Sequence, residues 1–149
     1  MAELGYQAGQ HELLAEQYQK NFPQEIKQAI KDAQKIVDTL KKDLKSYQVN
    51  LEKSYKNLDK SQLKYVKLQE DLTSTKDSLS SKPELEDEMR RKEQQTEEQR
   101  VEYAVQLVKT NKCRAQYYDC DLPTVLGRVE KLCESQYQYF ISVMTRWVR

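Results

Sequence analysis

The sequence predicts an all-α protein made of very long antiparallel helices that pack against each other as a coiled coil. One third of the residues are charged (33%) and the mean hydropathy is −0.95, which suits long solvated helices. Only 3 Gly and 3 Pro occur in 149 residues, so few positions can turn the chain. The apolar residues recur at alternating steps of three and four, and this periodicity argues against disorder.

The first helix is predicted over residues ~10–78. The opening "MAELGYQAG" holds two of the three glycines and has no firm periodicity, so the helix is expected to begin near Gln10. A heptad seam is expected from Ile30, Ala33, Val37, Leu40, Leu44, Tyr47 and Leu51. Tyr55 and Leu58 come next, with a step of four where three is due. This predicts a stutter in the coiled coil after Leu51.

A turn is predicted over 79–83, followed by a second helix over ~84–148. In "SLSSKPELEDE", serines compete for backbone hydrogen bonds, Pro83 suits a first helical position, and acids suit a helix start. The register holds across Pro123, which predicts a bend with local loss of hydrogen bonding rather than a break. The seam of this helix is expected from Val101, Ala104, Val108, Ala115, Tyr118, Leu122, Val125, Val129, Leu132, Tyr139, Val143 and Trp147.

No residue pattern points to catalysis, so we expect a protein that is not an enzyme and has no metal site and no cofactor. His11 is the only histidine, and no Cys/His pair has nucleophile–base or metal-ligand spacing. Cys113, Cys120 and Cys133 form no CxxC pair and are expected to be reduced thiols in a cytosolic protein. No apolar run approaches the roughly 20 residues that span a bilayer.

Lysines are concentrated on one side of the first helix. Between Lys27 and Lys67, eleven lysines stand against five acids, a local charge of +6 in a chain whose net charge is +1. At about 100° per residue they fall within an arc of roughly 140°, nearly opposite the seam. A solvated coiled-coil face would also place lysines there, but it would not require the positive excess. Such a face, without interleaved aromatic residues, suits an anionic membrane surface better than a base-reading site, so no nucleic-acid partner is expected.

The order of several segments resembles the F-BAR family over nearly the whole chain. "GYQAGQHELLAEQYQK" precedes the lysine-rich helix, and "VEYAVQLVKTNKCRAQYYDCDLPTVLGRVEKLCESQYQYF" follows the turn. Within it, "YYDCDLPTVLG" matches the pattern near the end of the family's third long helix, and "YQYFISVMTRWV" resembles the segment that follows. The family usually begins with a further helix that builds the dimer core. The resemblance therefore implies a single F-BAR-like domain over 1–149 that is truncated at its N-terminus.

The resemblance implies a homodimeric module that shapes membranes in endocytosis or actin remodelling. It also implies a cytoplasmic protein, peripheral on the inner face of the plasma membrane or on endocytic membranes. Its partners would be phosphatidylserine, phosphoinositides and actin-regulatory or endocytic proteins. The alternative from the residues alone is a coiled-coil scaffold or spacer that joins proteins and ignores lipid. The implied lipid-binding residues are Lys41, Lys42, Lys45, Lys53, Lys56, Lys60, Arg90 and Arg91.

Overall fold

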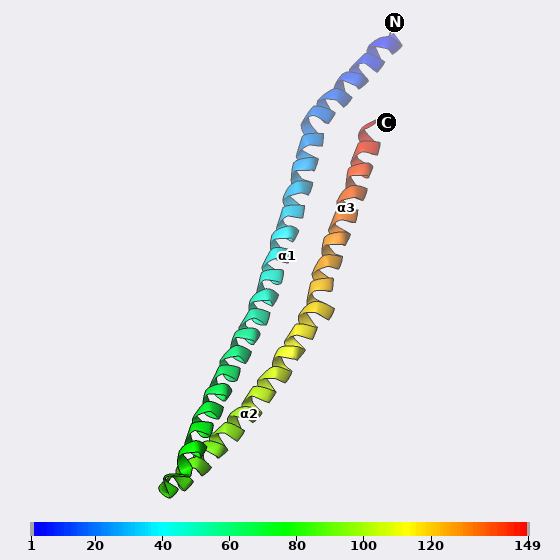
Figure 1. Cartoon of the computed structure of the whole chain (residues 1–149). Helices are drawn as coiled ribbons and strands as arrows, with labels where there is room; N and C mark the ends of the chain where they lie inside the picture. Colours follow the sequence, from blue (N-terminus) through cyan, green and yellow to red (C-terminus); the bar gives the residue numbers. More distant parts are fainter. Residues whose placement is uncertain (1, 149) are drawn as a thin grey trace. The chain divides into compact units, whose positions relative to one another are not determined.

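The computed structural model describes residues 2–148, and nearly all of them are helical (Figure 1). The long helix α1 spans Ala2–Leu79 and is followed by a turn and a 3-10 helix, η1 (Pro83–Leu85). Helix α2 (Glu86–Ala115), a π-helix, η2 (Gln116–Asp121), and helix α3 (Leu122–Val148) complete the chain. No strand occurs among the described residues, so the all-α prediction is confirmed.

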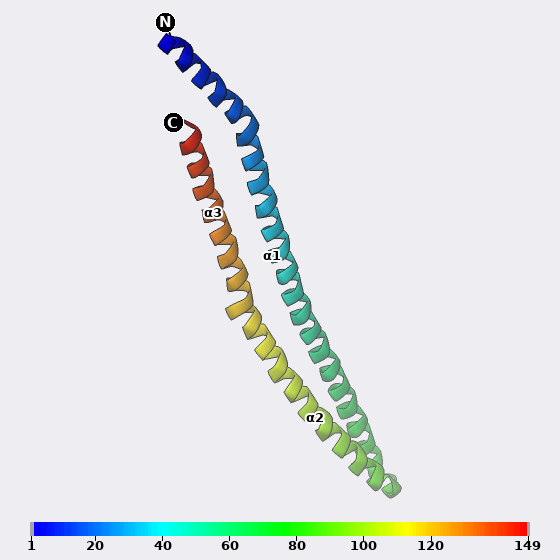
Figure 2. The ribbon, with the colours of Figure 1, turned by 180° about the vertical axis from the view of Figure 1, so that it is seen from behind.

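The chain contains two compact units. Unit 1 consists of Met1–Asp43 and Thr124–Arg149, and unit 2 consists of Leu44–Pro123. Each unit therefore combines a part of α1 with a later helical segment. In unit 2, α1 and α2 lie side by side in both views (Figures 1 and 2). The F-BAR-like domain and the strict coiled-coil packing stay predictions.

Helix α1 begins well before the predicted start near Gln10, because the opening residues continue the helix rather than precede it. Leu4, Gln7 and Ala8 are compatible with a helix, and the glycines among them do not adopt a positive φ. The predicted end of the helix is confirmed. Ser80 and Ser81 donate their hydroxyl protons to the carbonyls of Asp77 and Ser78, which closes the turn.

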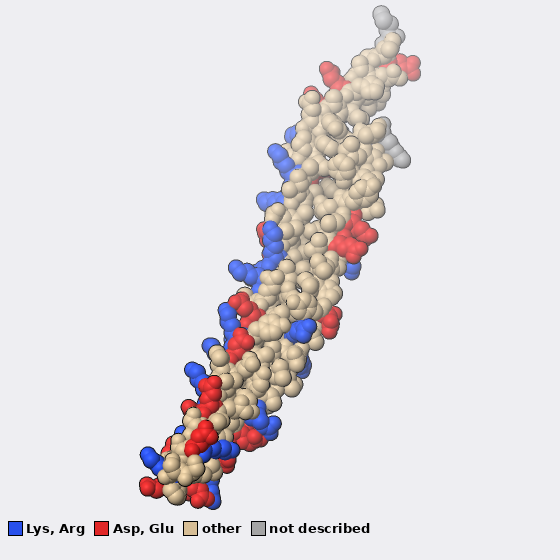
Figure 3. Space-filling view, in the orientation of Figure 1, with Lys and Arg blue, Asp and Glu red and all other residues tan. Residues whose placement is uncertain are grey.

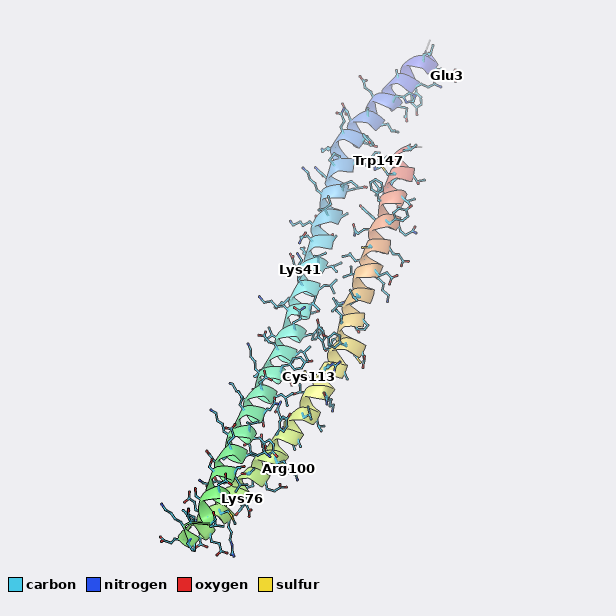
Figure 4. The ribbon with its side chains drawn as sticks, viewed as in Figure 1. Glu3, Lys41, Lys76, Arg100, Cys113 and Trp147 are labelled. Atoms are coloured by element: carbon cyan, nitrogen blue, oxygen red, sulfur yellow. The ribbon has the colours of Figure 1, made fainter. Side chains whose placement is uncertain are left out.

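Unit 1 is held by an apolar seam between α1 and α3. Leu40 is 3% exposed and Val143 is fully buried. The Trp147 ring meets Phe22 and Tyr18 edge-on, at centroid distances of 6.2 and 5.3 Å. Figure 4 labels Trp147 beside this part of α1. Two ion pairs flank the seam, Arg146–Glu25 at 3.2 Å and Arg128–Asp43 at 3.3 Å, so the two segments run in opposite directions.

The interior of unit 2 contains several polar side chains, which the sequence did not predict. Thr110 is 1% exposed, and its hydroxyl lies 3.1 Å from the hydroxyl of Ser54. Gln99, also buried, donates to the Ser61 hydroxyl at 3.1 Å. Further contacts between the segments are Lys92–Thr75, Thr96–Leu68, Lys76–Glu93 and the stacked rings of Tyr65 and Tyr103. Hydrogen-bonded pairs of this kind favour one register over its neighbours.

The predicted seam of the second helix is wrong between Val101 and Tyr118. Val101, Val108 and Tyr118 are exposed, and so are Ala104 and Ala115. The side chains that face α1 are Thr96, Gln99, Tyr103, Gln106, Thr110, Cys113 and Tyr117, all buried or half-buried. A search for apolar periodicity selects the wrong stripe here, because hydroxyls and amides that bond across the interface can replace apolar residues. After Pro123 the prediction holds for Val125, Leu132, Tyr139, Val143 and Trp147, whereas Val129 is exposed.

The predicted seam of α1 is correct from Ala33 to Leu51 and at Leu58, but it is wrong at Ile30 and Tyr55. Ile30 is 63% exposed and the half-buried Ala29 faces inward instead. The stutter after Leu51 does not occur. Ser54 occupies the inward position through its bond to the other segment, and Tyr55 is exposed.

Pro123 follows a π-helix rather than a break in the helix. Proline lacks an N–H, and inside an α-helix its ring would collide with the carbonyl four residues earlier. In the wider turn that precedes it, the Leu122 N–H bonds to the carbonyl of Tyr117, five residues back. Gln116 also donates to the carboxylate of Asp121, five positions further on, at 3.0 Å. The predicted local change in hydrogen bonding therefore takes the form of a register shift by one residue.

Replacing Thr110 by valine is expected to destabilise the protein by about 1–2 kcal/mol, because the Ser54 hydroxyl loses its partner while the shape is kept. Urea unfolding followed by circular dichroism would measure this change. Thr73→Val is the matched control, since Thr73 is exposed and bonds only within its own helix. A Thr110→Val protein as stable as this control would contradict a stabilising polar seam.

Candidate functional site

The candidate site is a row of exposed lysines on α1, which we call the lysine flank. All six lysines predicted for lipid binding are exposed. Lys41 and Lys42 belong to unit 1, and Lys45, Lys53, Lys56 and Lys60 belong to unit 2. Figure 3 shows basic side chains along α1, and Figure 4 labels Lys41. The flank also contains exposed lysines of the same row that were not among the predicted site residues, namely Lys27, Lys31, Lys35, Lys64 and Lys67.

Helical spacing places the lysines of unit 2 on one side of α1. Lys45, Lys53, Lys56 and Lys60 are separated by multiples of three and four residues, so their side chains share a face. The inward side of the same segment carries Leu51 and other residues that contact α2. Val49 lies midway between Lys45 and Lys53 on the flank and is 51% exposed. Val49 thus stands among ammonium groups, as does Leu63, which is 61% exposed, near Lys60 and Lys64.

Most charges of the lysine flank are not neutralised within the chain. Among the described residues, only two of the eleven lysines lie in an ion pair. Lys56 lies 2.6 Å from Glu52 and Lys35 lies 3.9 Å from Asp32. The hydrogen bond from Lys56 lowers the pKa of the Glu52 carboxyl, and the charge of Lys56 lowers it further. Because both pairs are solvent-exposed, they remove little of the positive potential over the rest of the flank.

Arg90 and Arg91 lie on α2 rather than on the helix that carries the lysine flank. Both are exposed, and as adjacent residues they point about 100° apart. Arg90 is paired with Glu86 at 2.9 Å. Their contribution to a shared basic surface stays a prediction.

The start of α2 is acidic and partly self-neutralised. Between Glu84 and Glu102 there are eight acids and four basic residues. Ion pairs within α2 join Arg100 to Glu97 at 2.6 Å and Lys92 to Glu88 at 3.0 Å. The hydrogen bond from Arg100 is the main cause of the lowered pKa of Glu97. The excess of positive charge is therefore a property of residues 27–67 of α1 and not of the start of α2.

The described part of the chain contains no group of three or more potential metal-ligating residues. His11 lies exposed on α1. None of the helices in residues 2–148 has an apolar stretch long enough to cross a bilayer.

Apolar side chains are exposed over much of both units. The accessible surface of the chain is 12048 Å², whereas a compact protein of this mass exposes about 8,000 Å². The excess, on the order of 4,000 Å², reflects helices that pack along one side only. Large exposed apolar residues on α3 include Leu126, Tyr137, Phe140 and Val148.

The fold and the flank define a class of protein, a helical protein with a basic outer face on its longest helix. In comparisons with known proteins, no family model, curated protein or solved structure matches the chain.

Proposed function

We propose that this protein is a peripheral membrane-binding module that engages anionic phospholipids through the lysine flank. The single observation that carries the proposal is that nine of the eleven flank lysines are exposed and lie in no ion pair with a described acid. Each such lysine near an anionic leaflet contributes about 1 kcal/mol of attraction. Lysine ammonium groups suit this loose attraction to phosphatidylserine or phosphoinositides better than bidentate recognition.

The proposal includes a homodimer of F-BAR-like antiparallel coiled-coil architecture. It also includes binding rather than catalysis, on the cytoplasmic side of the plasma membrane or of endocytic membranes. The large exposed apolar surface supports a second chain. The segment order of the F-BAR family supports the link to membrane shaping and to endocytic or actin-regulatory partners. Lys41, Lys42, Lys45, Lys53, Lys56 and Lys60 are the proposed lipid contacts. Arg90 and Arg91 have a weaker claim because they lie on another helix.

A second candidate function is a scaffold that joins helical proteins without binding lipid. It is favoured by the apolar stripe on α2 that faces away from α1, where Val108 is 68% exposed and Val101 and Val105 are exposed too. This stripe repeats at helical spacing and lies on a segment whose lysines are few. A scaffold function alone does not explain the excess of positive charge between Lys27 and Lys67.

Salt-dependent sedimentation with vesicles separates the two functions. We expect the protein to sediment with phosphatidylserine vesicles at low salt and to be released as ionic strength rises above about 0.15 M. It should not bind phosphatidylcholine vesicles. Negative-stain imaging of the pellet would reveal whether the vesicles are drawn into tubules. Equal sedimentation with neutral and anionic vesicles would rule out the lysine flank as the binding surface.

A further inference from the structure

Helix α3 carries a second apolar stripe beside the one that packs against α1. The stripe residues follow each other at steps of three and four, so they share one side of the helix. All of them are exposed, in contrast to Val125, Val143 and the other residues of the seam in unit 1. The stripe consists of Leu126, Val129, Cys133, Tyr137, Phe140, Met144 and Val148.

The composition of this stripe is that of an interface core. Tyr, Phe and Met are enriched where proteins contact each other, and charged residues are depleted there. None of the seven stripe residues is charged, and Glu130 lies at the border of the stripe, at the same helical angle as Val148. Its exposed side chains present on the order of 700 Å² of apolar surface, so that two such stripes in contact would bury about 1,400 Å², within the range of stable interfaces.

We propose that the α3 stripe binds the α3 stripe of a second copy of this chain, in antiparallel orientation about a twofold axis at Tyr137. The sequence is self-complementary in this arrangement. Leu126 lies level with Val148 of the second copy, and Val129 lies within one residue of the level of its Met144. Cys133 lies within one residue of the level of Phe140 of the second copy, and Tyr137 meets its own counterpart. Each stripe residue therefore lies opposite an apolar stripe residue of the second copy, so the stripe is self-complementary, as an isologous contact requires.

The acidic residues beside the stripe select this orientation. Glu130 and Glu134 lie on one border of the stripe. In a parallel pair, each would face its own copy across the interface, and like charges would repel. In the antiparallel pair, Glu130 lies level with Met144 of the second copy and Glu134 with its Phe140, so no two acids meet. This inference rests on the homodimer included in the proposed function and identifies the surface that forms it.

Cross-linking at the axis tests the arrangement. In a protein with Cys113, Cys120 and Cys133 replaced by alanine, Tyr137→Cys is expected to give a covalent dimer with a short bis-maleimide. Lys131→Cys, on the polar side of α3 and six residues from the axis, is expected to stay monomeric on the gel under the same conditions. Cross-linking at position 131 without cross-linking at position 137 would overturn the proposed pairing.

Because Tyr137→Cys removes a stripe residue and could weaken the dimer, a second pair of variants tests the interface with Tyr137 in place. In the natural sequence, Phe140→Asp is expected to weaken the dimer at least tenfold by analytical ultracentrifugation, because it buries a charge at the centre of the interface. The control is Gln138→Asp, since Gln138 is exposed and lies off the stripe. Circular dichroism checks that both variants remain helical. A Phe140→Asp protein that dimerises as tightly as the natural protein would contradict the proposal.

Vesicle sedimentation of the same proteins keeps this inference separate from membrane binding. If the natural protein binds anionic vesicles but forms no dimer sensitive to Phe140→Asp, only the α3 interface is wrong. If the dimer behaves as expected and no vesicles are bound, the interface stands and the lipid function fails.

Discussion

Replacing Lys45, Lys53 and Lys60 by glutamate is expected to weaken binding to phosphatidylserine vesicles by roughly 100-fold. Each lysine contributes about 1 kcal/mol near an anionic surface, and three of them correspond to about two decades of affinity. None of the three lies in an ion pair within the described residues, so the substitutions break no internal contact. Binding isotherms at a fixed salt concentration would measure the change.

The control for this triple variant changes the net charge equally on another helix. Lys109, Lys112 and Arg114 are exposed on α2 and point to different sides of it. Their replacement by glutamate is expected to reduce binding far less than the flank variant does. If both triple variants lose affinity equally, net charge rather than the lysine flank drives the association, and the proposed site is wrong.

Replacing Leu40 by alanine is expected to destabilise the protein by about 2–4 kcal/mol, because it removes buried methyl groups from the seam of unit 1 and leaves a cavity. Leu40 is 3% exposed, whereas Ile30, which the sequence pattern assigned to the same seam, is 63% exposed. Ile30→Ala is therefore the control and should cost well under 1 kcal/mol.

Urea unfolding followed by circular dichroism would measure both changes. The two variants delete similar apolar groups from one helix, so their difference reports burial and not helix propensity. Equal destabilisation by the two substitutions would show that the seam of unit 1 has been placed in the wrong register.

The sequence predicted the helices well and their contacts only in part. Long helices with one turn between Leu79 and Pro83 followed from composition, proline placement and periodicity. The interior of unit 2 did not follow, because Ser54, Gln99 and Thr110 are ordinary surface residues by type. Their burial depends on partners more than 35 residues away in sequence, and no local pattern reveals such pairs.

The same limit explains the outcome for the candidate site. The exposure of Lys45, Lys53 and Lys56 was predictable, since spacing alone puts them opposite Leu51. Arg90 and Arg91 lie on α2, and their place in the same basic surface stays a prediction. The π-helix before Pro123 was not predictable in form, because several distortions can accommodate a proline.

The central claim is that the lysine flank of α1 contacts an anionic bilayer, and a fluorophore at Val49 tests it most directly. Val49 lies between Lys45 and Lys53 and is exposed, so a cysteine there can carry an environment-sensitive dye in a protein whose natural cysteines are replaced. Adding phosphatidylserine vesicles should shift the emission to the blue at position 49 and leave it unchanged for the same dye at Val108 on α2. A blue shift at Val108 with none at Val49 would contradict the account.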